Sequence, residues 1–113
     1  MSKRIAVVIS EDPRATARPV EALRIALGLY AGDHEMTVVL LGNAPLLLNG
    51  DTEEIIDVDI LEKYLPSFKQ LSIPFVVEPG AVMDASARQF SVTTLLPADI
   101  REFVRSVDRS LVF

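Results

Sequence analysis

Strongly apolar runs alternate along this chain with segments in which apolar residues recur every three or four positions. Residues 5–9 form the first run, which is continuous and rich in β-branched side chains. Such a run is typical of a strand that is covered on both faces of a sheet. Residues 36–41 and 74–77 repeat the pattern, and shorter runs at 90–94 and 111–113 predict two more strands.

Helical spacing fills the intervals between these runs. One helix is predicted from Pro19, a second over residues 61–71 and a third from Pro97. Pro66 lies inside the second pattern, so that helix either kinks there or begins later, with Pro66 in its first turn. The apolar faces comprise Val20, Leu23, Leu27 and Tyr30, then Leu61, Tyr64, Leu65, Phe68 and Leu71, then Ile100, Phe103, Val104 and Val107.

A short helix is also predicted over residues 82–88, with Asp84 and Arg88 paired one turn apart. Strand and helix therefore alternate throughout, which favours a mostly parallel sheet with helices on both faces. We predict a three-layer α/β/α fold with about five strands. Because there is no internal repeat or linker, residues 1–113 are expected to form a single domain.

Composition restricts the classes of partner. Half of the 113 residues are hydrophobic and the mean hydropathy is +0.32, which predicts that other subunits cover part of the surface of so small a domain. The formal net charge of −5 argues against nucleic acid. No apolar run approaches the roughly 20 residues that span a bilayer, and the start of the chain lacks a cleavage site, so we expect no membrane partner and a cytoplasmic location.

The chain contains no cysteine and a single histidine, His34. This excludes disulfides, thiolate metal sites, a cysteine nucleophile and a persulfide carrier within the chain, as well as a histidine-based triad. His34 falls in a turn at the sheet edge opposite the one where α/β sites form, so we interpret it as structural. The acidic residues 51–59 lack the pattern of a calcium loop and are interrupted by apolar residues, which indicates a half-buried segment with a solvated face. We expect no metal and no cofactor.

Several polar residues follow the first three predicted strands, whose carboxyl ends meet at one sheet edge. Ser10, Arg14 and Arg18 follow the first strand, Asn43 the second and Glu78 the third. They outline a candidate cleft for an anion or a nucleotide. The first loop has no glycine, so neither a dinucleotide fingerprint nor a Walker loop is present, and a loop with solvated charges leading into a helix is the competing interpretation.

Glu78 leaves several roles open. A carboxylate at this point is a candidate general base, but it can equally cap a helix, pair with an arginine or hold an interface. Residues 46–48, three leucines near the same edge, are explained equally well by core packing and by contact with another subunit.

The order of these elements resembles the DsrE/DsrF-like sulfur-relay family, which includes TusB, TusC and TusD, and is most similar to the DsrF/TusC branch. The resemblance covers the chain from end to end. It rests on KRIAVVIS, EALRIALGLYAGDHEMTVVLLGNAPLLL, EKYLPSFKQLSIPFVV and DIREFVRSVDRSLVF.

The resemblance implies a domain that assembles as trimers or hexamers. In sulfur-carrying members a cysteine follows the strand that matches residues 73–77, and the matching region here is Glu78, Pro79 and Gly80. We therefore expect a non-catalytic subunit that forms a homo- or hetero-oligomer and serves sulfur trafficking with cysteine-bearing relay proteins. The alternatives are a small-ligand binding module and, with least support, an enzyme that uses Glu78 as a base.

Overall fold

The protein forms a five-stranded parallel sheet. The structure is a computed structural model and describes residues 2–113. The strands lie in the order β4-β3-β2-β1-β5, and every neighbouring pair is parallel. Their bounds are β1 Arg4–Ile9, β2 Glu35–Leu40, β3 Phe75–Val77, β4 Val92–Thr94 and β5 Arg109–Val112. The predicted α/β class and parallel sheet are confirmed.

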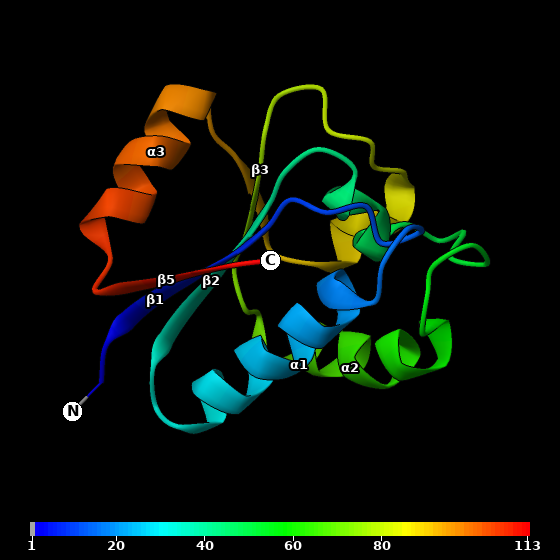
Figure 1. Ribbon diagram of the computed structural model, residues 1–113, viewed down its shortest axis with the longest axis horizontal. Helices are drawn as coiled ribbons and strands as arrows, with labels where there is room; N and C mark the ends of the chain where they lie inside the picture. Colours follow the sequence, from blue (N-terminus) through cyan, green and yellow to red (C-terminus); the bar gives the residue numbers. More distant parts are fainter. Residues whose placement is uncertain (1) are drawn as a thin grey trace.

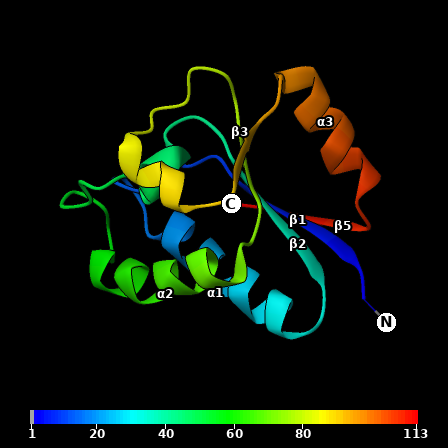
Figure 2. The same ribbon diagram turned by 180° about the vertical axis from the view of Figure 1, so that it is seen from behind.

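Helices cover both faces of this sheet (Figure 1). The helices α1 (Arg18–Ala31) and α2 (Val58–Leu71) lie side by side on one face, and α3 (Pro97–Ser106) lies on the other. The view from behind shows the same three layers (Figure 2). Two short 3₁₀ helices, η1 (Ala44–Leu48) and η2 (Ala85–Gln89), belong to the loops after β2 and β3. None of the helices described is long and apolar enough to cross a membrane.

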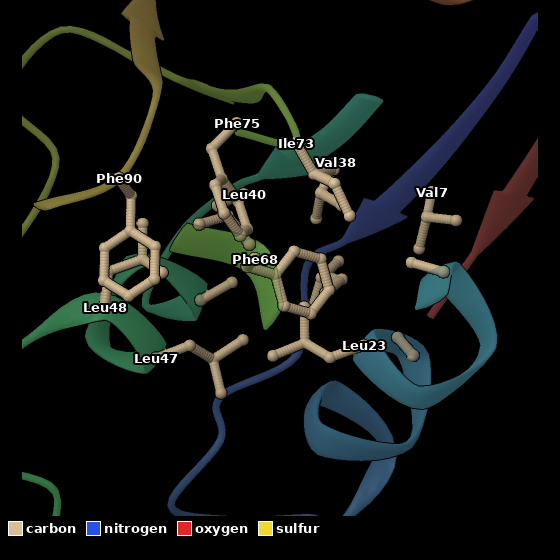
Figure 3. Close-up of a cluster of buried hydrophobic side chains, with 14 of the residues drawn as sticks. Val7, Leu23, Val38, Leu40, Leu47, Leu48, Phe68, Ile73, Phe75 and Phe90 are labelled. Carbon is tan, nitrogen blue, oxygen red and sulfur yellow. The ribbon is translucent and has the colours of Figure 1, made fainter. Parts of the chain in front are cut away.

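The main core lies between the sheet and the pair α1 and α2. Phe75 of β3 is fully buried there, with its ring centroid 5.3 Å from Phe68 of α2 and 5.8 Å from Phe90 (Figure 3). Leu47 and Leu48 of η1 are also buried in this cluster, so packing within the chain explains these two leucines. A much smaller cluster joins the opposite face of the sheet to α3. The burial is therefore uneven between the two faces.

Two helix predictions need correction. The helix α2 begins at Val58, eight residues before Pro66, so the alternative that it starts at Pro66 is wrong. Pro66 is exposed, and the packing of the fully buried Leu61 and Phe68 on either side of it outweighs the one backbone hydrogen bond that proline removes.

The other correction concerns the segment predicted as a helix over residues 82–88, which forms the 3₁₀ helix η2 instead. Asp84 is its N-cap residue and accepts a hydrogen bond from the Ser86 backbone N–H at 2.9 Å. A 3₁₀ helix aligns residues three apart, not four. Consistent with this geometry, no ion pair joins Asp84 and Arg88 within residues 2–113.

Candidate functional site

The loops that follow β1, β2 and β3 meet at one edge of the sheet, as the parallel topology requires. Ser10 comes directly after β1, Asn43 three residues after the end of β2, and Glu78 directly after β3. Phe113 lies beside Ser10 at this edge, because the Ser10 backbone N–H donates a hydrogen bond to the Phe113 carbonyl at 2.8 Å. The structure thus brings the predicted cleft residues to the same edge of the sheet.

Arg14 is held by a carboxylate of its own loop. Its Nε and Nη2 lie 3.0 and 2.8 Å from the two oxygens of Asp12, and its backbone N–H donates to the same carboxylate. Asn43 adds a bond from its Nδ2 to Asp12 Oδ2 at 3.1 Å. The Arg14 hydrogen bond holds the pKa of Asp12 well below its ordinary range, and the pKa of Arg14 is raised by the same contact.

Arg18 is also occupied. Its Nε lies 2.7 Å from Glu11 Oε2, and its guanidinium lies 5.5 Å from the centroid of the Phe113 ring. Both cations of the predicted anion site therefore have a carboxylate partner in the same loop. An incoming anion would have to displace these carboxylates, so the loop is preorganised as a network of internal ion pairs.

Glu78 opens a tight turn. Pro79 and Gly80 occupy the two central positions, Gly80 has a φ of +78°, and the Ala81 N–H donates to the Glu78 carbonyl at 3.2 Å. Proline followed by a residue of positive φ is the signature of a type II turn. The sequence EPGA thus fixes the backbone at the end of β3 through Pro79 and Gly80, without using the side chain of Glu78.

The half-buried Glu78 carboxylate points toward the loop after β2. Its Oε1 accepts a long hydrogen bond of 3.5 Å from the backbone N–H of Gly42. Within residues 2–113 it pairs with no arginine, and the N-cap of the next helix is Asp84. Within the described residues of one chain, Glu78 therefore neither pairs with an arginine nor caps η2, while the hypotheses of a general base and an interface residue stay untested.

Sequence reasoning missed a second network that ties the loops after β2 and β3 together. Asp84 Oδ2 accepts from the Gly50 N–H at 2.9 Å, and the Asp84 N–H donates to Asn49 Oδ1 at 3.0 Å. The Gly50 bond is the main reason that the pKa of Asp84 is lowered. An aspartate just before a short helix is a local signal for a cap, but its partner 34 residues away is visible only in the fold.

A pocket of about 250 Å³ lies beside this network. It is lined by Arg14, Leu46, Asn49, Asp51, Glu54 and Ile55. Of the five predicted cleft residues only Arg14 reaches it. Its two carboxylates make it unsuited to a strongly anionic ligand.

The remaining predicted features have simple structural roles. His34 Nδ1 accepts a hydrogen bond from the Lys3 backbone N–H at 3.2 Å, at the opposite edge of the sheet, a structural contact in line with its interpretation. The carboxylates of residues 51–59 are exposed while Ile55 is buried, as predicted for a half-buried segment. Within the part of the chain that the structure describes, no group of three histidine or carboxylate side chains is arranged to hold a metal ion.

Comparisons with known proteins agree with this architecture. No curated protein matches the chain significantly. Among solved structures, the crystal structure of the ychN protein from E. coli is similar over 100% of both chains, with a TM-score of 0.73 and 16% sequence identity. This likeness shows that the two proteins share a fold. The sequence profile of the DsrE/DsrF-like family matches residues 3–113, and the chain therefore belongs to the DsrE/DsrF-like family.

Proposed function

We propose that this protein is a subunit of an oligomeric sulfur-trafficking complex and does not carry sulfur itself. It would provide a scaffold or a docking surface, while a cysteine-bearing partner holds the sulfur. Membership of the DsrE/DsrF-like family supports the sulfur-related role. Within that family, we further propose that the protein is most similar to the DsrF/TusC branch.

The end of β3 carries this proposal. In the sulfur-carrying members that the chain resembles, a cysteine follows the corresponding strand. Here the matching region is Glu78, Pro79 and Gly80, and the chain has no cysteine at all. The Glu78 carboxylate lies against the Gly42 backbone. A thiolate can attack a persulfide and retain its outer sulfur as a new persulfide, whereas a carboxylate forms no comparable stable species.

Capture of partners from the native host tests this proposal. The tagged chain should retain a cysteine-bearing relay protein on an affinity column, and the retained partner should accept sulfur from a persulfide donor. The affinity tag without the chain, passed over the same lysate, is the control for non-specific capture. Repeated capture without any cysteine-bearing protein would reject the docking role.

The small-ligand alternative has weaker support in the site. Arg14 and Arg18 are both paired with carboxylates, and the pocket of about 250 Å³ adds Asp51 and Glu54. A thermal-shift screen with phosphate, sulfate and nucleotides distinguishes this alternative. A stabilisation that disappears in Arg14→Gln would establish a ligand site, and the absence of any shift would count against one.

The enzyme alternative rests on Glu78 alone. The only hydrogen bond that its side chain makes with residues 2–113 is the long one from Gly42. Catalysis by a general base would require Glu78→Gln to abolish turnover of a substrate found by screening. Turnover that survives this substitution would exclude the role.

A further inference from the structure

An apolar groove remains open on the face of the sheet that α3 covers. Two helices of 14 residues cover the other face, but α3 has only 10 residues and cannot cover five strands. The groove has a volume of about 290 Å³. Its apolar lining consists of Val8, Leu41, Ile100, Val104 and Val112. Val112 of the edge strand β5 is 64% exposed there.

Two cations border this groove. Arg101 and Arg105 lie one turn apart on α3 and complete the lining. The three ion pairs within residues 2–113 involve Arg14, Arg18 and Arg24, so neither arginine of the groove takes part in one. The groove therefore offers an apolar floor with a positive rim, in a chain whose formal net charge is −5.

The same chain carries a surface of matching chemistry. We define the acidic segment as residues 51–59 together with Ile60, in the first turn of α2. Its carboxylates are all exposed and take no part in the ion pairs of the described residues. Ile56 and Ile60 are 36% and 41% exposed among them, which gives the segment apolar side chains of its own.

The acidic segment cannot reach the groove of its own chain. It lies at one end of the longest axis, which is 38 Å, and α3 lies at the other end (Figures 1 and 2). We propose that the acidic segment of a second copy docks in the groove beside α3, with Ile56 and Ile60 on the apolar floor and the carboxylates facing Arg101 and Arg105. This inference rests on the oligomeric subunit proposed above and identifies its interface.

Such a contact joins two different surfaces of the same chain, so it is heterologous. A pair of copies joined in this way still has one free groove and one free acidic segment, so the assembly grows until it closes into a ring or forms a filament. Complementary charge fixes the register of the contact, and the apolar side chains exclude water from its centre.

Charge reversal tests the contact by sedimentation velocity at micromolar concentration. The groove variant Arg101→Glu with Arg105→Glu and the segment variant Glu53→Lys with Asp59→Lys should each weaken self-association by about tenfold or more. The chain carrying all four substitutions keeps the formal net charge of −5 and should regain assembly, because its charges are exchanged between the two surfaces.

Two further variants control for folding and net charge. Lys3→Glu with Arg88→Glu changes the net charge as the groove variant does, but at exposed positions outside the groove, and should assemble normally. Val112→Asp alters one exposed side chain of the groove without touching α3, and should also weaken assembly. Circular dichroism confirms that each variant is folded.

The outcomes separate this inference from the proposed function. A monomeric wild-type chain, reversal variants that assemble normally, or a folded four-substitution chain that stays monomeric would each overturn the interface. Capture of a cysteine-bearing relay protein in any of these cases would leave the proposed function standing. Loss and recovery of assembly as described would support the interface whether or not that partner is captured.

Discussion

Phe75 is the residue on which the position of Glu78 most depends, and its removal should be costly. The strand β3 has only three residues, and two of them, Phe75 and Val77, are fully buried in the main core. Phe75 is the larger of the two and lies between the rings of Phe68 and Phe90. Truncation of a buried phenylalanine to alanine costs about 3 to 5 kcal/mol of unfolding free energy.

The value for Phe75→Ala should lie in the middle or upper part of this range. Each of its two aromatic contacts contributes about 0.5 to 1.5 kcal/mol beyond buried area, and both are lost. We expect a decrease of about 4 kcal/mol, a large share of the roughly 5 to 15 kcal/mol that stabilises a domain. For a chain of 113 residues this corresponds to a fall in Tm of about 15 °C.

Urea unfolding followed by circular dichroism measures the change, at one fixed protein concentration because association alters apparent stability. Phe75→Leu keeps most of the volume and should cost about 1.5 kcal/mol, so it remains measurable if the alanine variant does not fold. Leu96→Ala, at a side chain that is 60% exposed, is the control and should cost about 0.5 kcal/mol or less.

Similar costs for Phe75→Ala and Leu96→Ala would contradict a rigid anchoring of β3 by the Phe75 ring. That result would mean that the cluster around β3 relaxes freely when the ring is removed. The end of β3 would then not be held rigidly in place, and the packing of Phe75 would not fix the position of Glu78.

Three further predictions concern the loops at the carboxyl edge. In Glu78→Cys, the new cysteine is the only thiol of the chain and should attack the outer sulfur of a persulfide donor, releasing the donor thiolate. Mass spectrometry should then detect one added sulfur per chain. Ser110→Cys, on the exposed strand β5, is the matched single-thiol control. Gly80→Ala should lower the unfolding free energy by about 1 kcal/mol in urea, because alanine resists the φ of +78° although a Cβ meets no atom within 4 Å. The pKa of Asp12 is depressed in the folded protein, so its stabilising contribution is complete above the ordinary carboxyl pKa and is lost as the pH falls below about 4. Asp12→Asn should therefore flatten the dependence of Tm on pH in that range. An unchanged profile would contradict this role of Asp12.

The strands and most helices were predictable because their signals are local. The apolar run at residues 5–9 and the helical spacing after Pro19 each match an element to within a residue or two, at β1 and α1. The start of α2 was not predictable in this way. Asp57 precedes it with a φ of 63°, and the helix continues through Pro66 because buried residues on both sides hold it against the sheet.

The position of the candidate site was predictable from the sequence, but the pairing of its charged side chains was not. Parallel strands place their carboxyl ends at one edge, so Ser10, Asn43 and Glu78 could be placed together from the sequence. Which carboxylate each arginine would bind could not be read from the sequence, because Glu11 and Asp12 are adjacent carboxylates in the same loop. Tertiary structure decides between such near-equivalent partners.

In the turn after β3, the backbone geometry does not depend on the side chain of residue 78, which is the group available for chemistry. The backbone there is determined by Pro79, by the positive φ of Gly80 and by the hydrogen bond from Ala81 to the carbonyl of residue 78, none of which involves the side chain at that position. Among the described residues, 2–113, the side chain of Glu78 makes one long hydrogen bond only. A sheet edge of this kind can therefore keep its shape while residue 78 varies, so a fold shared between proteins that are 16% identical does not imply a shared reaction. In this chain the backbone of the turn is set by Pro79 and Gly80, whereas any chemistry at the end of β3 depends on the side chain at position 78.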